Sequence, residues 1–294
     1  MSSGIQRLTP EQYADYGYRL LHEIPDPPEQ LWCMGTPPAS HLTLLAVVGS
    51  RAYTTYGRQV VETLLGALRG QPIGIVSGLA RGIDGLAHTA ALDAGLYTLA
   101  IPGSGLDPSV IYPRQHRGLA DRICEAGGGL LSELPPQTRA ARWTFPRRNR
   151  LMAGISHATL LVEAKERSGT LITARLCAEY DRELLVVPGN IFSPGSRGTH
   201  QFLKLGATPV TSPDDILDAL QLPVDPPTTP TADTPPPDIT PTEANVLEAM
   251  HEPVDLDTII TRTQLPSHEV STVLMSLELR SCIRSSNGLY HRNI

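Results

Sequence analysis

Short apolar runs alternate with amphipathic stretches through the middle of the chain. The runs are mostly continuous rather than alternating, as in strands that are buried on both faces of a parallel sheet. They are Leu42–Val48, Ile73–Val76, Tyr97–Ile101, Leu130–Leu131, Thr159–Val162 and Leu184–Val187. Amphipathic segments such as Tyr56–Leu68 and Thr170–Tyr180 lie between them. This rhythm predicts an α/β fold, a Rossmann-like doubly wound and mostly parallel sheet, over residues 41–222.

The pattern changes on both sides of this segment. Residues 1–40 are rich in Pro and Tyr and have weak periodicity, so we expect only a short, partial helical element there. Eight prolines fall between Pro223 and Pro241. That composition predicts an extended, Pro-rich linker over residues 223–240.

Residues 241–294 show the pattern of a small winged-helix domain. Thr240-x-x-Glu243 is a capping box that begins a first helix. The stretches "LDTIITRT" and "SHEVSTVLMSLELR" predict two more helices, and Asn287-Gly288 predicts the turn of a closing hairpin.

The third of these helices does not favour binding to duplex DNA. Residues Ser267–Leu279 contain no Lys or Arg, whereas Glu269 and Glu278 lie among them. A helix that reads base edges needs phosphate contacts to anchor it. We therefore expect this domain to contact protein or to have a structural role.

Charge is distributed unevenly along the 294 residues, whose formal net charge is −6. Residues 41–222 carry 18 basic and 15 acidic side chains, so the acidic excess lies in the flanks. A positive middle in an acidic protein indicates one local anionic ligand. There is no signal-like N-terminus and no apolar run long enough for a membrane span, so we expect a cytoplasmic protein without a membrane partner.

Neither a metal nor a cofactor is expected from the sequence. The four cysteines are far apart and lack C-x-x-C spacing, which favours free thiols; they are Cys33, Cys124, Cys177 and Cys282. The Walker, G-x-S-x-G and H-E-x-x-H motifs are absent, and G-x-G-x-x-G does not follow the first strand. Glu133, Glu163 and Asp84 lie at strand ends, where helix capping or a salt bridge to an arginine is favoured over acid–base catalysis. The sequence specifies no reaction.

Glycine-containing loops follow five of the predicted strands. They are Gly49–Arg51, Ser77–Asp84, Pro102–Gly105, Ser168–Thr170 and Pro188–Asn190. Ligands bind beyond the carboxyl ends of the strands in an open parallel sheet, and glycine loops before helix N-termini favour anions. One such loop is equally well explained as a tight turn, but five on one rim favour a phosphate or carboxylate site.

Arginines are concentrated before and within a predicted helix, with no Asp or Glu between Glu133 and Glu163. The run consists of Arg139, Arg142, Arg147, Arg148 and Arg150. Trp143 and Phe145 lie within it. Guanidinium groups bind phosphates and aromatic faces stack with bases, so the run favours single-stranded nucleic acid over a solvated helix face or a subunit contact.

Seven motifs occur in order at the strand exits. They are "VVGSR" (Val47–Arg51), "SGLARGID" (Ser77–Asp84), "GSGLD" (Gly103–Asp107), "YP" (Tyr112-Pro113), "FPRRNRLMAGIS" (Phe145–Ser156), "EAKERSGTLITA" (Glu163–Ala174) and "VPGN" (Val187–Asn190). Together they resemble the bacterial DNA-processing protein A (DprA/Smf) family over about residues 45–220. The resemblance implies a non-enzymatic protein that binds single-stranded DNA and helps load a RecA-type recombinase past single-strand binding protein. It also implies a role in natural transformation and recombination, and a homodimer formed through the Rossmann domain.

The resemblance also implies a binding site. Arg51 matches the phosphate-binding arginine of the family's G-S-R motif, and Arg114 matches a basic position that follows Tyr-Pro. DNA phosphates are the expected counter-ions of Arg142 to Arg150, and Phe145 is expected to stack on a base. The full set of expected residues is Gly49, Ser50, Arg51, Ser77, Gly78, Arg81, Gly82, Ser104, Gly105, Arg114, Arg142, Phe145, Arg147, Arg148, Asn149, Arg150, Lys165, Ser168, Gly169 and Thr170.

Two other functions remain open for the same fold. Related phosphoribohydrolases cleave nucleotides with a G-G-x-G-T-x-x-E loop, but here Thr173 stands where the catalytic carboxylate would be. A nucleotide sensor that signals through the winged helix would bind a mononucleotide tightly, with no dependence on oligonucleotide length.

Overall fold

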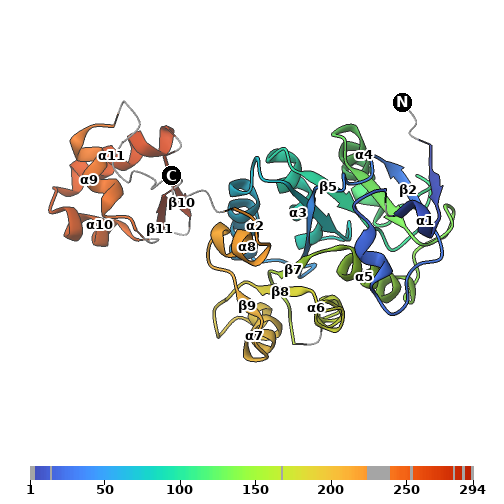
Figure 1. Cartoon of the computed structure of the whole chain (residues 1–294). Coiled ribbons are helices and arrows are strands. Elements are labelled where there is room, and N and C mark those ends of the chain that lie inside the picture. Colours follow the sequence, from blue (N-terminus) through green and yellow to red (C-terminus); the bar gives the residue numbers. More distant parts are fainter. Residues whose placement is uncertain are drawn as a thin grey trace. The chain divides into compact units, whose positions relative to one another are not determined.

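The computed structural model describes most of the chain. The described residues are 4–13, 15–166, 168–223, 239–251, 254–280, 282–286 and 289–292. Two compact units are present, Met1–Val224 and Asp225–Ile294 (Figure 1), and each is described by itself.

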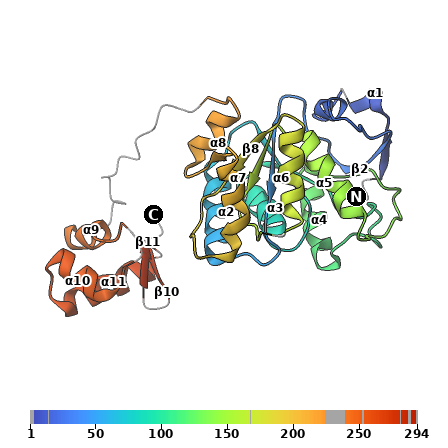
Figure 2. The same cartoon turned by 90° about the horizontal axis from the view of Figure 1, so that it is seen from below.

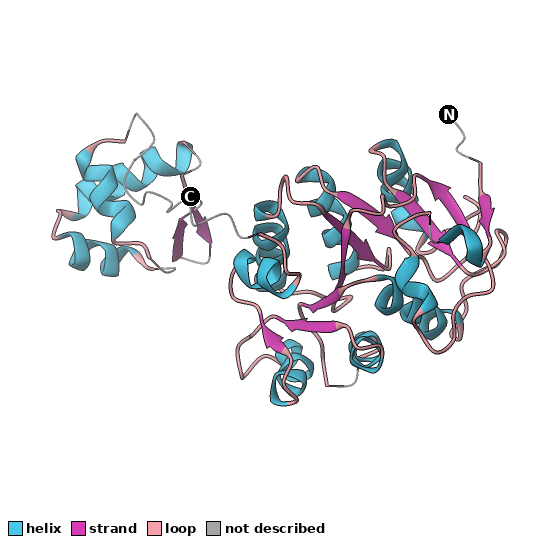
Figure 3. Cartoon of the chain, viewed as in Figure 1, coloured by secondary structure: helices cyan, strands magenta, loops and turns pink. Residues whose placement is uncertain are grey.

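A mixed sheet of nine described strands forms the centre of the first unit (Figure 3). In spatial order the strands are β1 (Gln6–Leu8), β2 (Leu31–Gly35), β6 (Gly129–Ser132), β5 (Tyr97–Ala100), β4 (Ile73–Ser77), β3 (Thr43–Val48), β7 (Ala158–Leu161), β8 (Glu183–Val186) and β9 (Thr208–Pro209). Strands β3 to β9 are all parallel to one another, while β2 is antiparallel to β6 and β1 is antiparallel to β2. The six strands expected from the apolar runs are confirmed, each to within one residue at either end.

The strand order reverses once in the parallel part of the sheet. From β3 the chain proceeds outward through β4, β5 and β6, then returns to β7 beside β3 and proceeds outward through β8 and β9. This is the doubly wound arrangement that the sequence predicts. Its switch point lies between β3 and β7, where the loops beyond the carboxyl ends diverge and leave a crevice for a ligand.

Helices cover both faces of the sheet (Figure 2). One face carries α2 (Thr55–Ala67), α3 (Ile83–Asp93), α4 (Arg117–Glu125) and α8 (Pro213–Ala219), and the other carries α5 (Thr144–Ile155), α6 (Thr170–Glu179) and α7 (Arg197–Lys204). Successive residues of a strand therefore enter different cores: Leu44 and Ala46 pack on the α5 side, whereas Leu45 and Val47 pack on the α2 side. Burial on both faces explains why the strand sequences are continuously apolar.

The N-terminal 40 residues form more than the partial helical element that the sequence predicts. The helical part exists as α1 (Pro10–Tyr13) and a 3₁₀ turn at Arg19–His22, but β1 and β2 extend the sheet beyond β6. These strands are three and five residues long. Runs that short carry too little periodicity to be recognised, and pairing with β6 rather than local propensity determines their conformation.

The second unit contains α9 (Pro241–Glu248), α10 (Leu256–Thr263), α11 (Ser267–Leu279) and an antiparallel pair, β10 (Ile283–Ser286) and β11 (Leu289–Arg292). The capping box is confirmed: the Thr240 amide donates to Glu243 Oε2 at 2.9 Å, and the Glu243 amide donates to Thr240 Oγ1 at 3.3 Å. The Asn287-Gly288 turn and linker residues 224–238 lie outside the described residues.

None of the described helices has the length and apolar character needed to cross a membrane.

Candidate functional site

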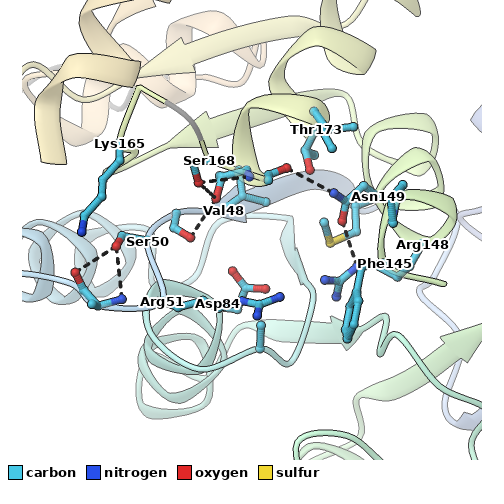
Figure 4. Close-up of a pocket in the computed structure, with 18 of the residues that line it drawn as sticks. Val48, Ser50, Arg51, Asp84, Phe145, Arg148, Asn149, Lys165, Ser168 and Thr173 are labelled. Atoms are coloured by element: carbon cyan, nitrogen blue, oxygen red, sulfur yellow. Dashed lines mark hydrogen bonds between the residues drawn. The ribbon is translucent and has the colours of Figure 1, made fainter. Parts of the chain in front are cut away.

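A pocket of about 540 Å³ opens at the switch point, among the loops that follow β3, β4 and β7 and the first turns of α5 (Figure 4). We call it the switch-point pocket. It is lined by Val48, Gly49, Ser50, Arg51, Ala52, Ala80, Asp84, Arg142, Phe145, Pro146, Arg148, Asn149, Met152, Lys165, Ser168, Gly169, Thr170, Ile172 and Thr173.

Two glycines allow the loops that line this pocket to lie close together. A Cβ on Gly49 would approach the Ile83 side chain at 2.6 Å, so only glycine lets α3 begin against the end of β3. Gly82 has φ +87° and packs directly on the backbone of Ser50 and Arg51. A side chain at either position would separate the two loops.

The mouth of the pocket is positively charged. Arg51, Arg142 and Lys165 are exposed. The Arg51 guanidinium carbon lies 5.4 Å from the centre of the Phe145 ring, a cation–π contact that leaves the ring half-buried. Asp84 is the one acid among the described residues of the lining. The mouth therefore attracts anions.

Arg148 is buried in the wall of the pocket rather than exposed at its mouth, with a relative accessibility of 7%. Its Nη1 donates to the carbonyls of Gly78 and Ile101, the latter at 2.6 Å, and its Nε donates to Asn149 Oδ1 at 3.1 Å. Arg148 thus ties the loops after β4 and β5 to α5. Burial raises the pKa of the neighbouring Asp84 carboxyl, while the Arg148 guanidinium and the amides of Ala80 and Gly78 oppose that shift.

Among Arg142 to Arg150, for which DNA phosphates are the expected counter-ions, two arginines already pair with a carboxylate of the protein. Arg147 Nε lies 2.9 Å from Glu133 Oε2, and Arg150 Nη2 lies 2.5 Å from Glu133 Oε1. The salt bridge favoured for Glu133 is confirmed. Glu133 immediately follows β6, and the fold brings it beside α5, which the distance along the sequence does not reveal.

Glu163 has a structural role at the start of a helix. Its carboxylate accepts hydrogen bonds from the amide of Thr54 at 3.0 Å and from the Thr54 hydroxyl. Thr54 is the N-cap of α2, and its hydroxyl in turn accepts from the Gly57 amide. Glu163 therefore fixes the start of α2 against the end of β7.

Eleven of the twenty predicted site residues line the switch-point pocket. Arg81 and Arg114 line a second depression. The other seven line neither depression: Ser77, Gly78, Gly82, Ser104, Gly105, Arg147 and Arg150. Ser77 and Ser104 are fully buried, and their hydroxyls donate to the carbonyls of Val47 and Gly105. Whether these residues contact DNA remains a prediction.

The second depression has a volume of about 770 Å³. We call it the tyrosine groove. It is lined by Arg81, Ser109, Val110, Ile111, Tyr112, Pro113, Arg114, Gln115, Arg117, Arg139 and Ala140. The Tyr112 ring lies edge-on to the Phe145 ring, with centroids 5.8 Å apart, so the two depressions adjoin.

Sequence reasoning missed several lining residues. The sequence indicates only a structural role for Asp84, and it marks Thr173 only as the residue that stands where a catalytic carboxylate would be. Both residues line the pocket. Thr173 is one helical turn after Thr170, so its spacing could have placed it on the same side. No group of three metal-ligating side chains occurs in the part of the chain that the structure describes.

Comparison with known proteins assigns the family. The model of the DNA recombination-mediator protein A family matches residues 8–221, and that of the DprA winged helix domain matches residues 230–288. Protein Smf of Escherichia coli K12 is 41% identical over 278 residues, which cover 91% of this chain and 72% of that protein. DNA processing protein DprA of Bacillus subtilis is 39% identical over 206 residues, 68% of this chain and 67% of the relative.

Two solved structures are similar to this chain in fold and in sequence. The crystal structure of DNA processing protein A from Streptococcus pneumoniae has a TM-score of 0.68 and 36% identity, covering 75% of each chain. The Helicobacter pylori protein, whose structure concerns its mode of binding single-stranded DNA, has a TM-score of 0.64 and 28% identity, covering 75% of this chain and 98% of that one. The chain belongs to the DNA processing protein A (DprA/Smf) family.

Proposed function

We propose that this protein binds single-stranded DNA at the switch-point pocket. The observation that carries the proposal is the combination at one mouth of three exposed cations, Arg51, Arg142 and Lys165, with the half-buried ring of Phe145. Cations hold the phosphates and an aromatic face stacks with an unpaired base, which is the chemistry of single-strand binding. The single-stranded DNA binding of the H. pylori relative supports the proposal.

The aromatic side chains favour a single strand over a duplex. Trp143 is 57% exposed and Tyr112 is 46% exposed, and both lie near Phe145 in sequence or in space. Bases of a duplex are already stacked on one another, so these rings gain little from it. The winged-helix unit offers no alternative duplex site on α11, because Glu269 and Glu278 are exposed there.

The proposed biological role is recombination mediation. The protein would hold single-stranded DNA and help a RecA-type recombinase to load onto it where single-strand binding protein competes, in natural transformation and recombination. The family description as a recombination mediator supports this role. The pocket itself supports it too, because contacts to phosphates and base faces leave the base edges available for a search for homology.

We also propose that two copies associate through the Rossmann-like unit. Ile191, Phe192 and Leu205 are 72%, 86% and 80% exposed. Large apolar side chains so exposed favour burial against a partner. Sedimentation of wild type and Phe192→Asp tests this: a dimer that the substitution dissociates supports it, and a wild-type monomer at high concentration contradicts it.

The pocket favours binding over nucleotide cleavage. Its one described carboxylate, Asp84, accepts hydrogen bonds from the loop amides of Gly78 and Ala80 and faces Arg148. Thr173, which replaces the carboxylate of the phosphoribohydrolase loop, is buried. A carboxylate occupied in this way holds the loop in place and is not available to activate water.

The test is fluorescence anisotropy with labelled oligo-dT, challenged with unlabelled single strand or duplex. We expect the single strand to compete well and the duplex poorly, and no free base to appear when nucleoside monophosphates are incubated with the protein. Equal competition by duplex, or turnover of a mononucleotide, would overturn the proposal.

A further inference from the structure

Residues 78–82 connect β4 to α3 through an unfavourable backbone conformation, and we call them the β4–α3 loop. Leu79 has φ +55° and Gly82 has φ +87°. Glycine adopts a positive φ freely, whereas a bulky leucine does not, so the conformation at Leu79 persists only where the surrounding structure fixes it. The Leu79 side chain is fully buried. The contacts of the loop therefore show what holds it in place.

His116, which is distant in sequence, holds the backbone of this loop. It is the last residue of the 3₁₀ turn Arg114–His116 before α4, and its Nδ1 lies 2.8 Å from the carbonyl oxygen of Leu79. Because a carbonyl oxygen only accepts hydrogen bonds, Nδ1 is the donor. The ring also packs on Gly85 in the first turn of α3, where an added Cβ would lie 2.8 Å from His116 Cε1. His116 thus contacts both the loop and the helix that follows it.

Other polar groups of the β4–α3 loop are held from the side of the pocket. Arg148 donates to the Gly78 carbonyl, and the amides of Gly78 and Ala80 donate to the Asp84 carboxylate. Arg148 and Asp84 line the switch-point pocket, whereas His116 lines neither the pocket nor the tyrosine groove. Any effect of His116 on a ligand in the pocket is therefore indirect.

The loop supports the backbone of Arg51 in turn. The Ile83 amide donates to the Ser50 carbonyl at 3.1 Å, and a Cβ added to Gly82 would lie 2.5 Å from Arg51 Cα. The Arg51 guanidinium lies over the Phe145 ring and forms no ion pair with the described part of the chain. Its position therefore depends on where the loop places the Arg51 backbone.

We propose that His116 is a positioning residue for the switch-point pocket. Its hydrogen bond to the Leu79 carbonyl keeps the β4–α3 loop in place, and the loop keeps Arg51 at the pocket mouth. Without this bond the carbonyl loses its donor and the positive φ of Leu79 loses a constraint, so Arg51 is no longer held in one position. The inference rests on the proposed function, in which Arg51 binds a phosphate.

A double-mutant cycle measures the coupling between the two side chains. Anisotropy with labelled dT12 is recorded for full-length wild type, Arg51→Ala, His116→Ala and the double variant. His116→Asn is added because its side-chain amide nitrogen takes the place of Nδ1 and still donates a hydrogen bond. His41→Ala is the matched control, since His41 is exposed and precedes the amino end of β3, at the opposite edge of the sheet.

Urea unfolding of each variant shows that it is folded. His116→Leu removes the donor but keeps apolar bulk against Gly85, and it takes the place of His116→Ala in the cycle if the alanine variant does not fold.

His116→Ala should weaken dT12 binding about fivefold when Arg51 is present, but by less than about twofold in the Arg51→Ala background, because coupled residues are not additive. His116→Asn and His41→Ala should bind dT12 as wild type does. Wild-type affinity without the His116 donor, an equal loss in both backgrounds, or failure of His116→Asn to restore binding would overturn the inference and leave the proposed function intact. If wild type does not bind dT12, the proposed function fails and the inference fails with it.

Discussion

Arginines that are neighbours in sequence differ sharply in role here. Arg148 is buried and holds two loop carbonyls, Arg147 and Arg150 share the carboxylate of Glu133, and Arg142 is exposed at the pocket mouth. Arg147 is also exposed but is paired with Glu133, so Arg142 is the exposed member of this group without an ion pair in the described part of the chain. Substitution of a single arginine therefore tests binding cleanly only where that arginine is exposed, because substitution of a buried arginine also changes the stability of the fold.

The contrast between Arg51 and Arg148 makes a direct prediction. Arg148→Ala should lower the free energy of unfolding by about 3 kcal/mol, because it leaves the buried Asp84 carboxyl without its cation. Arg51→Ala should change the free energy of unfolding by less than about 0.5 kcal/mol, because Arg51 is exposed. It should weaken single-strand binding about tenfold. Urea unfolding and anisotropy of both variants check this, and similar stability of the two variants would contradict it.

His88 on α3 predicts a pH dependence of stability. It is fully buried, its Nδ1 lies 2.8 Å from Thr98 Oγ1, and burial lowers the pKa of His88 from 6.5 to about 3. Below pH 6.5 the unfolded chain therefore binds a proton that the folded protein does not, so this contribution is present above pH 6.5 and is lost as the pH falls. From pH 7 to pH 5 the free energy of unfolding should fall by about 2 kcal/mol through this group. His88→Asn should lack that part of the decrease, and an identical pH profile in the variant would refute the assignment.

At the scale of elements, helix α5 determines the shape of the site. Its first turns contribute Phe145, Arg148 and Asn149 to the pocket. Its rear face is fixed by Glu133 and by Leu21 and Ile24 of the N-terminal segment, which pack on Gly154. The position of these pocket residues thus depends on contacts made on the other side of the helix.

Removal of the Glu133 charge should loosen this helix. Glu133→Gln should lower the free energy of unfolding by about 2 kcal/mol, because the buried Arg150 would lose the nearer of its two carboxylates and keep only the exposed Asp26, whose Oδ2 lies 3.6 Å from Arg150 Nε. In this variant, amide hydrogen exchange in Thr144–Ile155 should be faster than in wild type, whereas exchange in α2 should not change. Glu125→Gln, an exposed carboxylate at the end of α4, is the control and should change neither quantity.

The elements themselves were largely predictable from the sequence, whereas the contacts across them were not. Continuous apolar runs identify strands because burial on both faces requires them, as at Thr43–Val48. The pairing of Glu133 with Arg150 could not be predicted, since it depends on β6 and α5 meeting at the rim. The strands Gln6–Leu8 and Leu31–Gly35 escaped recognition because pairing with a neighbour determines their conformation.

At the scale of the whole molecule, the two units have separate hydrophobic cores. Val246, Ile259, Val270 and Leu274 belong to a cluster confined to the second unit. The exposed cations of the pocket and of the tyrosine groove all lie in the first. Single-strand binding is therefore expected to be a property of the Rossmann-like unit.

Truncation to residues 1–223 should leave the affinity for oligo-dT undiminished. The removed residues carry ten acidic and four basic side chains and so contribute no attraction for phosphates overall. Anisotropy on the truncated and full-length proteins at the same salt concentration checks this expectation. A large loss of affinity on truncation would show that the winged-helix unit contacts DNA.

The most direct measurement of the central claim is the salt dependence of oligo-dT binding by wild type and Arg51→Ala. If the switch-point pocket holds DNA phosphates, the wild-type affinity falls steeply with salt. The slope of log K against log salt for Arg51→Ala is then shallower by about 0.7, the value of one lost phosphate contact on a single strand. An Arg51→Ala protein that is fully folded and has the wild-type affinity and slope would contradict the account, because DNA would then be bound elsewhere on the molecule.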